Sequence, residues 1–240
     1  MERLDKIVST GGGVSRSDAR KFILRSRVTV NQKTVRDIAF KVDPNVDTIT
    51  LNGEEICYKK HLYLIMNKPK GVLTATEDKI KQTVIDLIPD ELRRRDLFPV
   101  GRLDKDTTGL LIITNDGDFA HQLLSPNKKV PKKYFVTLDG IINKDLVQKF
   151  KSGLTLADGT ELSSAELEIA TEPNTAFITI TEGKYHQIKR MFGIFDLGVN
   201  ELKRVSFAGL SLPKNLAEGE VRELNINEFE CIKNAKNMAK

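Results

Sequence analysis

The densest group of polar side chains in the sequence lies between Gly101 and Leu111, where two carboxylates are followed by two hydroxyl groups, between two glycines. Asp104 and Asp106 could bind a cation, or one of them could act as a nucleophile or a general base. A carboxylate that reacts in a partly buried site must stay ionised, and a neighbouring cation helps to keep it so. The segment therefore predicts a carboxylate site, with three interpretations to compare.

Two of these interpretations need a metal ion. As a calcium loop of the EF-hand type, the segment that starts at Asp104 has Asn115 in the twelfth position instead of a bidentate glutamate, and no flanking helix pair is evident. As the D-x-D-x-T motif of haloacid-dehalogenase-type phosphatases, it should follow a buried parallel strand, but Arg102 interrupts the apolar residues before it. We therefore disfavour both interpretations and expect no metal site.

The third interpretation is a family resemblance. Residues 101–111 read G-R-L-D-K-D-T-T-G-L-L and resemble the G-R-L-D-x-D-T-x-G-L-L segment of pseudouridine synthases of the ribosomal small-subunit type. Residues 67–71 (N-K-P-K-G), 132–136 (K-K-Y-F-V) and 182–191 (E-G-K-Y-H-Q-I-K-R-M) resemble the other motifs of that family, in the same order. The resemblance covers nearly the whole chain. It implies an enzyme that converts a uridine of ribosomal RNA to pseudouridine without a cofactor.

The resemblance also implies roles for four side chains. Asp104 is the carboxylate on which the reaction depends, and Lys189 is the basic residue that we expect to form an ion pair with it. Tyr134 is expected to stack on a uracil that has left the RNA helix. Arg102 is expected either to extrude or hold the target nucleotide or to contact a phosphate. The competing interpretations are a solvated helix cation for Lys189 and an ordinary core tyrosine for Tyr134.

Positive charge is concentrated at the N-terminus. The chain has a net charge of +5, and residues 1–41 contain ten Lys or Arg against four Asp or Glu, so that the rest of the chain is nearly neutral. This asymmetry predicts a polyanionic partner, although a solvated helix face would have the same composition. A second basic cluster surrounds Pro131 and is expected to form an RNA-contacting loop. Its members are Lys128, Lys129, Lys132 and Lys133.

The N-terminal charge lies on a predicted helix pair. Residues 4–8 have helical spacing before a run of glycines, and Ser15 begins a second helix with Asp18 as its capping-box partner. Followed by V-T-V-N at residues 28–31, the pattern resembles the RNA-binding module named after ribosomal small-subunit protein four. The resemblance implies RNA binding in which backbone contacts dominate. The cations expected to make these contacts are Arg16, Arg20, Lys21 and Arg25.

The remaining pattern predicts an α+β protein of two parts. Residues 1–58 would form the RNA-binding module, and residues 59–240 a catalytic domain with a mixed, largely antiparallel sheet. The strands are expected at 62–66, 110–114, 134–138, 176–181 and 199–207, with an amphipathic helix at 185–195.

The composition of the chain indicates in which cellular compartment the protein is expected. The 240 residues are 40% hydrophobic and 30% charged, and the apolar runs are far shorter than the roughly 20 residues that span a bilayer. The N-terminus has no apolar signal core. Cys57 and Cys231 are isolated, which excludes a thiolate zinc knuckle. We expect a cytoplasmic monomer without a membrane partner.

The expected substrate follows from residues 185–191. The sequence of this segment resembles the small-subunit branch of the family more than its large-subunit relatives, in which Arg tends to replace both His186 and Lys189. The predicted partner is therefore 16S rRNA or a small-subunit assembly intermediate. The alternatives are the same chemistry on 23S rRNA, or a non-catalytic RNA-binding or ribosome-assembly protein. Release of tritium from uracil C5 would distinguish an enzyme from such a protein.

Overall fold

The computed structural model describes residues 1–56 and 58–238, so Cys57 lies outside the described range. The chain divides into two compact units, Met1–His61 and Leu62–Lys240. Each unit has an apolar core of its own. Among the described residues, no helix combines the length and the apolar character needed to cross a bilayer.

The first unit is built on a helix pair, α1 (Leu4–Gly11) and α2 (Arg16–Leu24). Ser15 caps α2 because its hydroxyl accepts a hydrogen bond from the backbone N–H of Asp18, as the capping-box pattern predicts. Six short strands complete the unit: β1 (Glu2–Arg3), β2 (Val28–Val30), β3 (Lys33–Thr34), β4 (Lys41–Val42), β5 (Ile49–Leu51) and β6 (Glu54–Glu55). They form one sheet of β1 and β4 and another in the order β3-β2-β5-β6.

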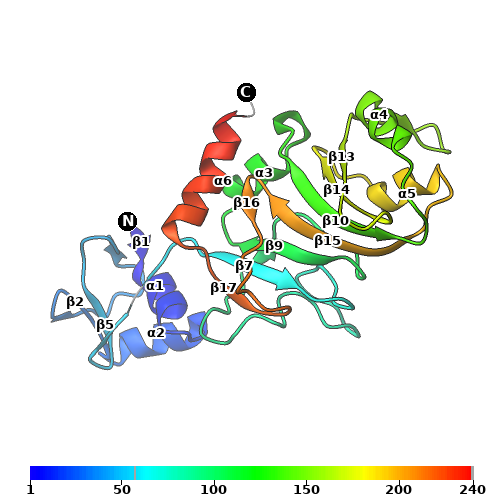
Figure 1. Cartoon of the computed structure of the whole chain (residues 1–240). Coiled ribbons are helices and arrows are strands. Elements are labelled where there is room, and N and C mark those ends of the chain that lie inside the picture. The colour runs from blue at the N-terminus through cyan, green and yellow to red at the C-terminus, as the bar shows by residue number, and fades with distance from the viewer. Residues whose placement is uncertain (57, 239–240) are drawn as a thin grey trace. The chain divides into compact units, whose positions relative to one another are not determined.

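The second unit is a mixed sheet in the order β13-β14-β10-β15-β9-β7-β17 (Figure 1). Neighbouring strands are antiparallel except β9 and β15, which run parallel. The seven strands are β7 (Tyr63–Lys68), β9 (Thr108–Thr114), β10 (Lys132–Leu138), β13 (Glu166–Ile169), β14 (Thr175–Ile180), β15 (Val199–Phe207) and β17 (Val221–Glu223). Short strands β8 (Phe98–Pro99) and β16 (Leu210–Ser211) pair with β9 and β15, and β11 (Leu154–Thr155) pairs with β12 (Glu161–Leu162). This is the α+β architecture that the sequence predicts.

Two apolar cores cover the two faces of this sheet, because side chains alternate along each strand. Leu64 and Met66 of β7 belong to the core that also contains residues of α4 (Asp145–Ser152) and α5 (Gln187–Gly193). Ile65 belongs to the opposite core. That second core is closed by α3 (Gly117–Leu124) and α6 (Ile226–Met238), and a short 3-10 turn, η1 (Pro126–Lys128), follows α3.

Gly109, the second residue of β9, allows β15 to lie close beside that strand. Its φ is +100°, and a Cβ atom there would lie only 2.3 Å from the backbone oxygen of Arg204. The close approach allows β15 to pair in parallel with β9 at Gly109 itself. The segment that contains Asp104 is therefore anchored directly against the middle of the sheet.

Helix α5 is shorter than the predicted helix at 185–195. His186 has a left-handed backbone with φ +47°, so the helix begins at Gln187. Gln187 holds the turn before it, because its side-chain oxygen accepts a hydrogen bond from the backbone N–H of Lys184 and its amide donates to Glu182.

Candidate active site

The loop that carries Asp104 is held on both sides by the segment that follows β7. The Thr74 hydroxyl donates to the backbone oxygen of Leu103 at 2.8 Å, and the Leu103 N–H donates to the same hydroxyl at 3.3 Å. On the other side, the backbone N–H of Gly71 donates to the oxygen of Lys105 at 2.8 Å. The residues before and after Asp104 thus have fixed backbone positions, which limits where its carboxylate can lie.

Lys68 adds a buried ammonium group beneath this loop. Its side chain is fully buried and donates to the backbone oxygens of Pro69 (3.0 Å), Lys105 (3.3 Å) and Thr107 (3.0 Å). Burial lowers the pKa of Lys68 to about 8, although the carboxylates of Asp106 and Asp104 oppose the shift. At neutral pH the charged group therefore connects β7 to the backbone of the aspartate loop.

Four of the six predicted site residues of the second unit line one pocket. Arg102 and Asp104 come from the loop before β9, Tyr134 from β10 and Lys189 from α5. The folded chain thus brings together residues from three of the motifs. Further lining residues come from the same loop (Leu103, Thr107), from β14 (Ile180), from the turn before α5 (Lys184, His186) and from β15 (Leu202).

Asp104 faces His186 across the pocket. The side chain of Asp104 is 33% exposed, and its Oδ1 lies 3.6 Å from Nε2 of His186. This separation is too long for a hydrogen bond but lies within ion-pair range. The left-handed backbone of His186 precedes α5, and the imidazole stacks on the ring of Tyr185 at 3.9 Å between centroids.

The predicted ion pair between Lys189 and Asp104 is wrong. Lys189 instead donates to Oδ2 of Asp106 at 2.5 Å, and it is this contact that lowers the pKa of Asp106. Residues 104–107 form a turn, closed by a hydrogen bond from the Thr107 N–H to the backbone oxygen of Asp104, and in this turn it is Asp106 that Lys189 reaches. Sequence spacing alone did not distinguish the two carboxylates.

Tyr134 is only 7% exposed, and it lies directly across the strand pair from Arg204 of β15. Arg204 is buried, its Nε donates to the backbone oxygen of Leu110 at 2.7 Å, and its guanidinium lies 4.8 Å from the ring centre of Phe207. Burial lowers the pKa of Arg204, and contact with the Tyr134 side chain opposes that shift. Tyr134 is thus both part of the apolar core and part of the pocket wall.

The second basic cluster is not the open loop that we expected. Lys132 and Lys133 begin β10. Lys132 donates to the backbone oxygen of Val130 and lies 5.7 Å from the ring centre of Phe207, and burial lowers its pKa to about 8. Lys133 contacts both carboxylate oxygens of Glu168. These contacts within the protein weaken the case for both lysines as RNA ligands.

The predicted RNA-contacting residues of the first unit lie on α2, except Arg25, which follows its end. Arg16 and Arg20 both contact Asp5 of α1. Lys21 forms an ion pair with Asp18 at 2.8 Å, and both side chains are exposed.

Three site residues were missed or given no role from sequence: Lys68, His186 and Arg204. A charged residue next to the apolar run Leu64–Met66 is a signal that could have identified Lys68, because a buried lysine needs dedicated acceptors. Arg204 carries the same kind of signal within β15. The placement of His186 opposite Asp104 has no local signal, since the two residues meet only in the tertiary structure.

The metal-dependent interpretations have little support in this geometry. The D-x-D-x-T segment precedes β9 and follows only the two-residue strand β8, instead of following a long parallel strand. Among residues 1–56 and 58–238, no group of three or more His, Cys, Asp or Glu side chains is arranged to hold a metal ion.

Two family models match the chain. Residues 62–193 match the RNA pseudouridylate synthase family, and residues 2–47 match the S4 domain. Each match lies within one of the two units, and the first alone covers more than half of the chain.

Relatives of known name match along nearly their full length. The ribosomal small subunit pseudouridine synthase A of Escherichia coli strain K12 is 38% identical over 96% of this chain and 99% of its own. The ribosomal large subunit pseudouridine synthase B of Bacillus subtilis strain 168 is 36% identical over 97% of this chain and 96% of its own. A crystal structure of a pseudouridylate synthase covers 97% of this chain and 100% of its own, with a TM-score of 0.68 and 32% identity.

Proposed function

Because this chain belongs to the RNA pseudouridylate synthase family and is an rRNA pseudouridine synthase, we propose that it modifies one uridine of 16S rRNA with Asp104 as the reacting carboxylate. The observation that carries the proposal is the single pocket in which Asp104, Tyr134, Lys189 and Arg102 meet. A carboxylate, an aromatic ring and two cations in one pocket suit a pyrimidine that has flipped out of the RNA and is flanked by negatively charged phosphates.

The reaction places modest demands on the protein. The N1–C1′ bond of uridine breaks, the uracil turns, and a C5–C1′ bond forms while the C5 proton is lost and N1 gains one. No net oxidation or reduction occurs. Asp104 could attack the sugar, attack the base or remove a sugar proton, and each route needs an ionised, accessible carboxylate. Its partial exposure within a loop of fixed backbone supports that role.

The target base has to leave the RNA stack, at a cost of a few kcal/mol. Tyr134 offers an aromatic surface at the pocket wall on which uracil could stack. Arg102 is exposed at the same pocket, where a guanidinium could hold the extruded nucleotide or its phosphate. These two contacts would offset part of the cost of unstacking.

The choice of 16S over 23S rRNA rests on the third motif. The two named relatives, one for each ribosomal subunit, differ too little in identity to decide. His186 and Lys189, which resemble the small-subunit branch, both line the pocket, and His186 faces Asp104. Residues that differ between the branches therefore lie where a target could be selected. We also propose that the enzyme is a cytoplasmic monomer with RNA binding in residues 1–58 and catalysis in 59–240.

The test uses rRNA labelled with tritium at uracil C5, because pseudouridine formation releases that hydrogen. We expect the full-length protein to release tritium from 16S rRNA or from a small-subunit assembly intermediate, and a pseudouridine map of cells lacking the gene to lose one 16S position. Release from 23S rRNA alone would refute the 16S assignment. No release from any of these substrates would favour a non-catalytic assembly protein.

Replacing Tyr134 separates stacking from core packing. Tyr134→Phe keeps the aromatic ring and is expected to retain most of the activity, whereas Tyr134→Ala should lower it about 10- to 100-fold, because one base stack contributes about 1–3 kcal/mol. Tyr134→Leu, which fills the core without an aromatic face, is the control for stability. Single-turnover rates and thermal melting are measured together. Equal rates for the Leu and Phe variants would show that Tyr134 is only a core residue.

Replacing Lys189 tests whether it does more than pair with Asp106. Lys189→Met is expected to lower single-turnover rates about 10²-fold, because it removes a positive charge in the pocket lining that could stabilise charge developing on the substrate. RNA affinity should change much less. Asp106→Asn is the comparison, because it breaks the same ion pair. This pair is exposed, so it contributes no more than about 1 kcal/mol to the free energy of folding. If both variants lose activity equally and slightly, Lys189 is merely the partner of Asp106.

A further inference from the structure

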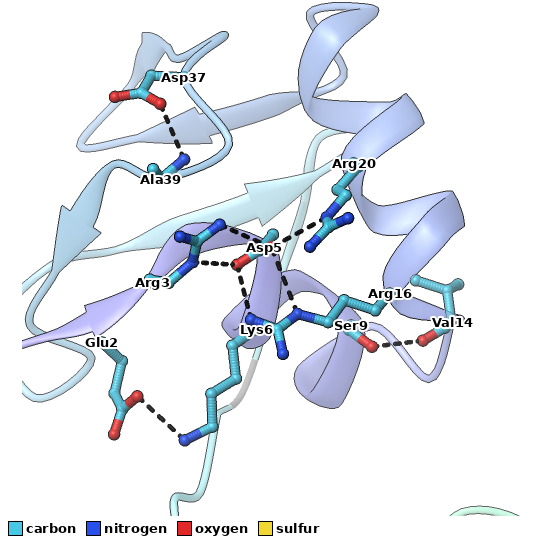
Figure 2. Close-up of polar contacts among 10 residues, drawn as sticks. All are labelled: Glu2, Arg3, Asp5, Lys6, Ser9, Val14, Arg16, Arg20, Asp37 and Ala39. Atoms are coloured by element: carbon cyan, nitrogen blue, oxygen red, sulfur yellow. Dashed lines mark hydrogen bonds and ion pairs between the residues drawn. The ribbon is translucent and has the colours of Figure 1, made fainter.

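The first unit contains a cluster of charged residues in which Arg3 joins Arg16 and Arg20, two of the predicted RNA-contacting cations, around a buried carboxylate. Asp5, in the first turn of α1, is fully buried, and three arginines contact its carboxylate (Figure 2). Arg3 donates from Nε and Nη2 at 3.0 and 3.1 Å, and Arg16 from the same atoms at 3.3 and 3.4 Å. Arg20 donates from Nε at 3.2 Å. One anion thus holds three cations.

The carboxylate stays ionised because of these contacts. Burial by itself would raise the pKa of Asp5, but hydrogen bonds from Arg3, Arg16 and Arg20 outweigh it and hold the pKa well below its usual range. The cluster therefore carries an excess of two positive charges. Asp37 acts weakly on Arg3, and its carboxylate accepts a hydrogen bond from the Ala39 N–H.

The three arginines contact Asp5 but keep N–H donors that Asp5 does not use. Their side chains are 42%, 53% and 49% exposed for Arg3, Arg16 and Arg20, in contrast to the buried Asp5. A guanidinium has five N–H donors, and each of these three gives at most two of them to Asp5. Arg16 and Arg20 lie one turn apart on α2, so they share a face of that helix.

We propose that Asp5 is a positioning residue that holds Arg3, Arg16 and Arg20 as a preformed site for adjacent backbone phosphates of RNA. A free arginine loses rotamer freedom when it binds, and an arginine already held at its Nε edge loses less. The planar guanidinium matches phosphate oxygens through paired N–H donors. The inference rests on RNA as the substrate of the enzyme, but not on which rRNA is modified.

Each arginine variant tests the site by removing one guanidinium and leaving two arginines in contact with Asp5. Binding of the full-length protein to a 16S rRNA transcript is measured over a range of salt concentrations. Arg16→Gln and Arg20→Gln should each weaken binding several-fold and reduce the slope of log K against log salt by about 0.7–0.9, the value for one lost phosphate contact. The control is Lys33→Gln, which removes the same charge from an exposed strand of the same unit and should leave the slope nearly unchanged.

Asp5→Asn gives a result whose sign is diagnostic. It makes the unit more positive by one charge, so that long-range attraction alone would tighten RNA binding. Positioning predicts the opposite, a several-fold weaker complex with a smaller salt slope. In an Arg16→Gln, Arg20→Gln background, the same substitution should cost little further affinity, because the groups that it positions are gone.

These outcomes separate the inference from the proposed function. Thermal melting of each variant establishes that it is folded, and if Asp5→Asn does not fold, the two arginine variants still decide. The inference would be overturned if the arginine variants showed the same slope of log K against log salt as Lys33→Gln. It would also be overturned if a folded Asp5→Asn protein bound RNA more tightly than the wild type. The enzyme activity would stand in either case. A wild-type protein that binds no rRNA would instead contradict the proposed function.

Discussion

Asp104→Asn is expected to lower the rate of tritium release by a factor on the order of 10⁴ or more, because it removes the carboxylate that we propose as the reacting group of the pocket. The amide has nearly the same shape and cannot carry the negative charge that each possible route requires. Asp104 lies in a loop whose backbone is held by Thr74 and Gly71, so the substitution should leave the fold intact. Single-turnover assays at saturating rRNA measure the effect.

Asp106→Asn provides the matched comparison, since it makes the same chemical change two residues away in the same turn. Its carboxylate pairs with Lys189 and is 54% exposed, so we expect a loss of no more than about tenfold. RNA binding should be similar for both variants, because neither residue adds positive charge. If Asp104→Asn isomerises its target at the wild-type rate, or if the two variants lose activity equally, the assignment of Asp104 is wrong.

Lys68→Met is expected to have the largest effect of any substitution outside the pocket lining. It removes the shared donor of the Pro69, Lys105 and Thr107 carbonyl oxygens, of which the contact to Thr107 is buried, and this should destabilise the second unit by about 2–4 kcal/mol. Because two of these oxygens belong to the aspartate loop, a shift of about 1 Å at Asp104 could cost about 10²-fold in rate. Chemical denaturation and single-turnover rates test the two consequences separately.

The pH dependence of stability gives an independent signature for Lys68. Burial lowers its pKa from 10.5 to about 8, so between those values the unfolded chain binds more protons than the folded one. The free energy of unfolding therefore rises with pH from 8 to 10.5 because of Lys68. Below pH 8 the burial of its charge destabilises the folded state by the full amount. Lys68→Met should flatten part of that rise, and the part due to Lys132, whose pKa is also about 8, should remain.

The exposed neighbour Lys105 supplies the control for this experiment. Lys105→Met removes a lysine side chain from the same loop but leaves the backbone oxygen that Lys68 contacts. We expect wild-type stability, rate and pH dependence. A Lys68→Met protein that matches this control in all three would show that the buried ammonium does not hold the loop.

The motifs predicted which residues line the site better than they predicted the contacts between them. The segment around Asp104, the strand that begins near Tyr134 and the motif that contains Lys189 identified the family and the residues that line the pocket. The pairing within the pocket was predicted incorrectly, because Asp104 and Asp106 are equivalent in type and differ only in the direction that the turn gives each side chain. The helix at 185–195 was predicted too long because a left-handed residue at His186 leaves the apolar spacing unchanged.

The amino-acid sequence by itself determined the α+β class, the capping of α2 by Ser15 and the charge asymmetry of the chain, because each depends on neighbouring residues or on composition. Only the tertiary structure decided that Lys68 supports the aspartate loop, that His186 faces Asp104 and that Asp5 gathers three arginines. Some of these contacts, such as those of Lys68 with Thr107 and of His186 with Asp104, join residues far apart in the chain, and the energies of all of them depend on burial and direction. Neither quantity is present in residue type or local spacing.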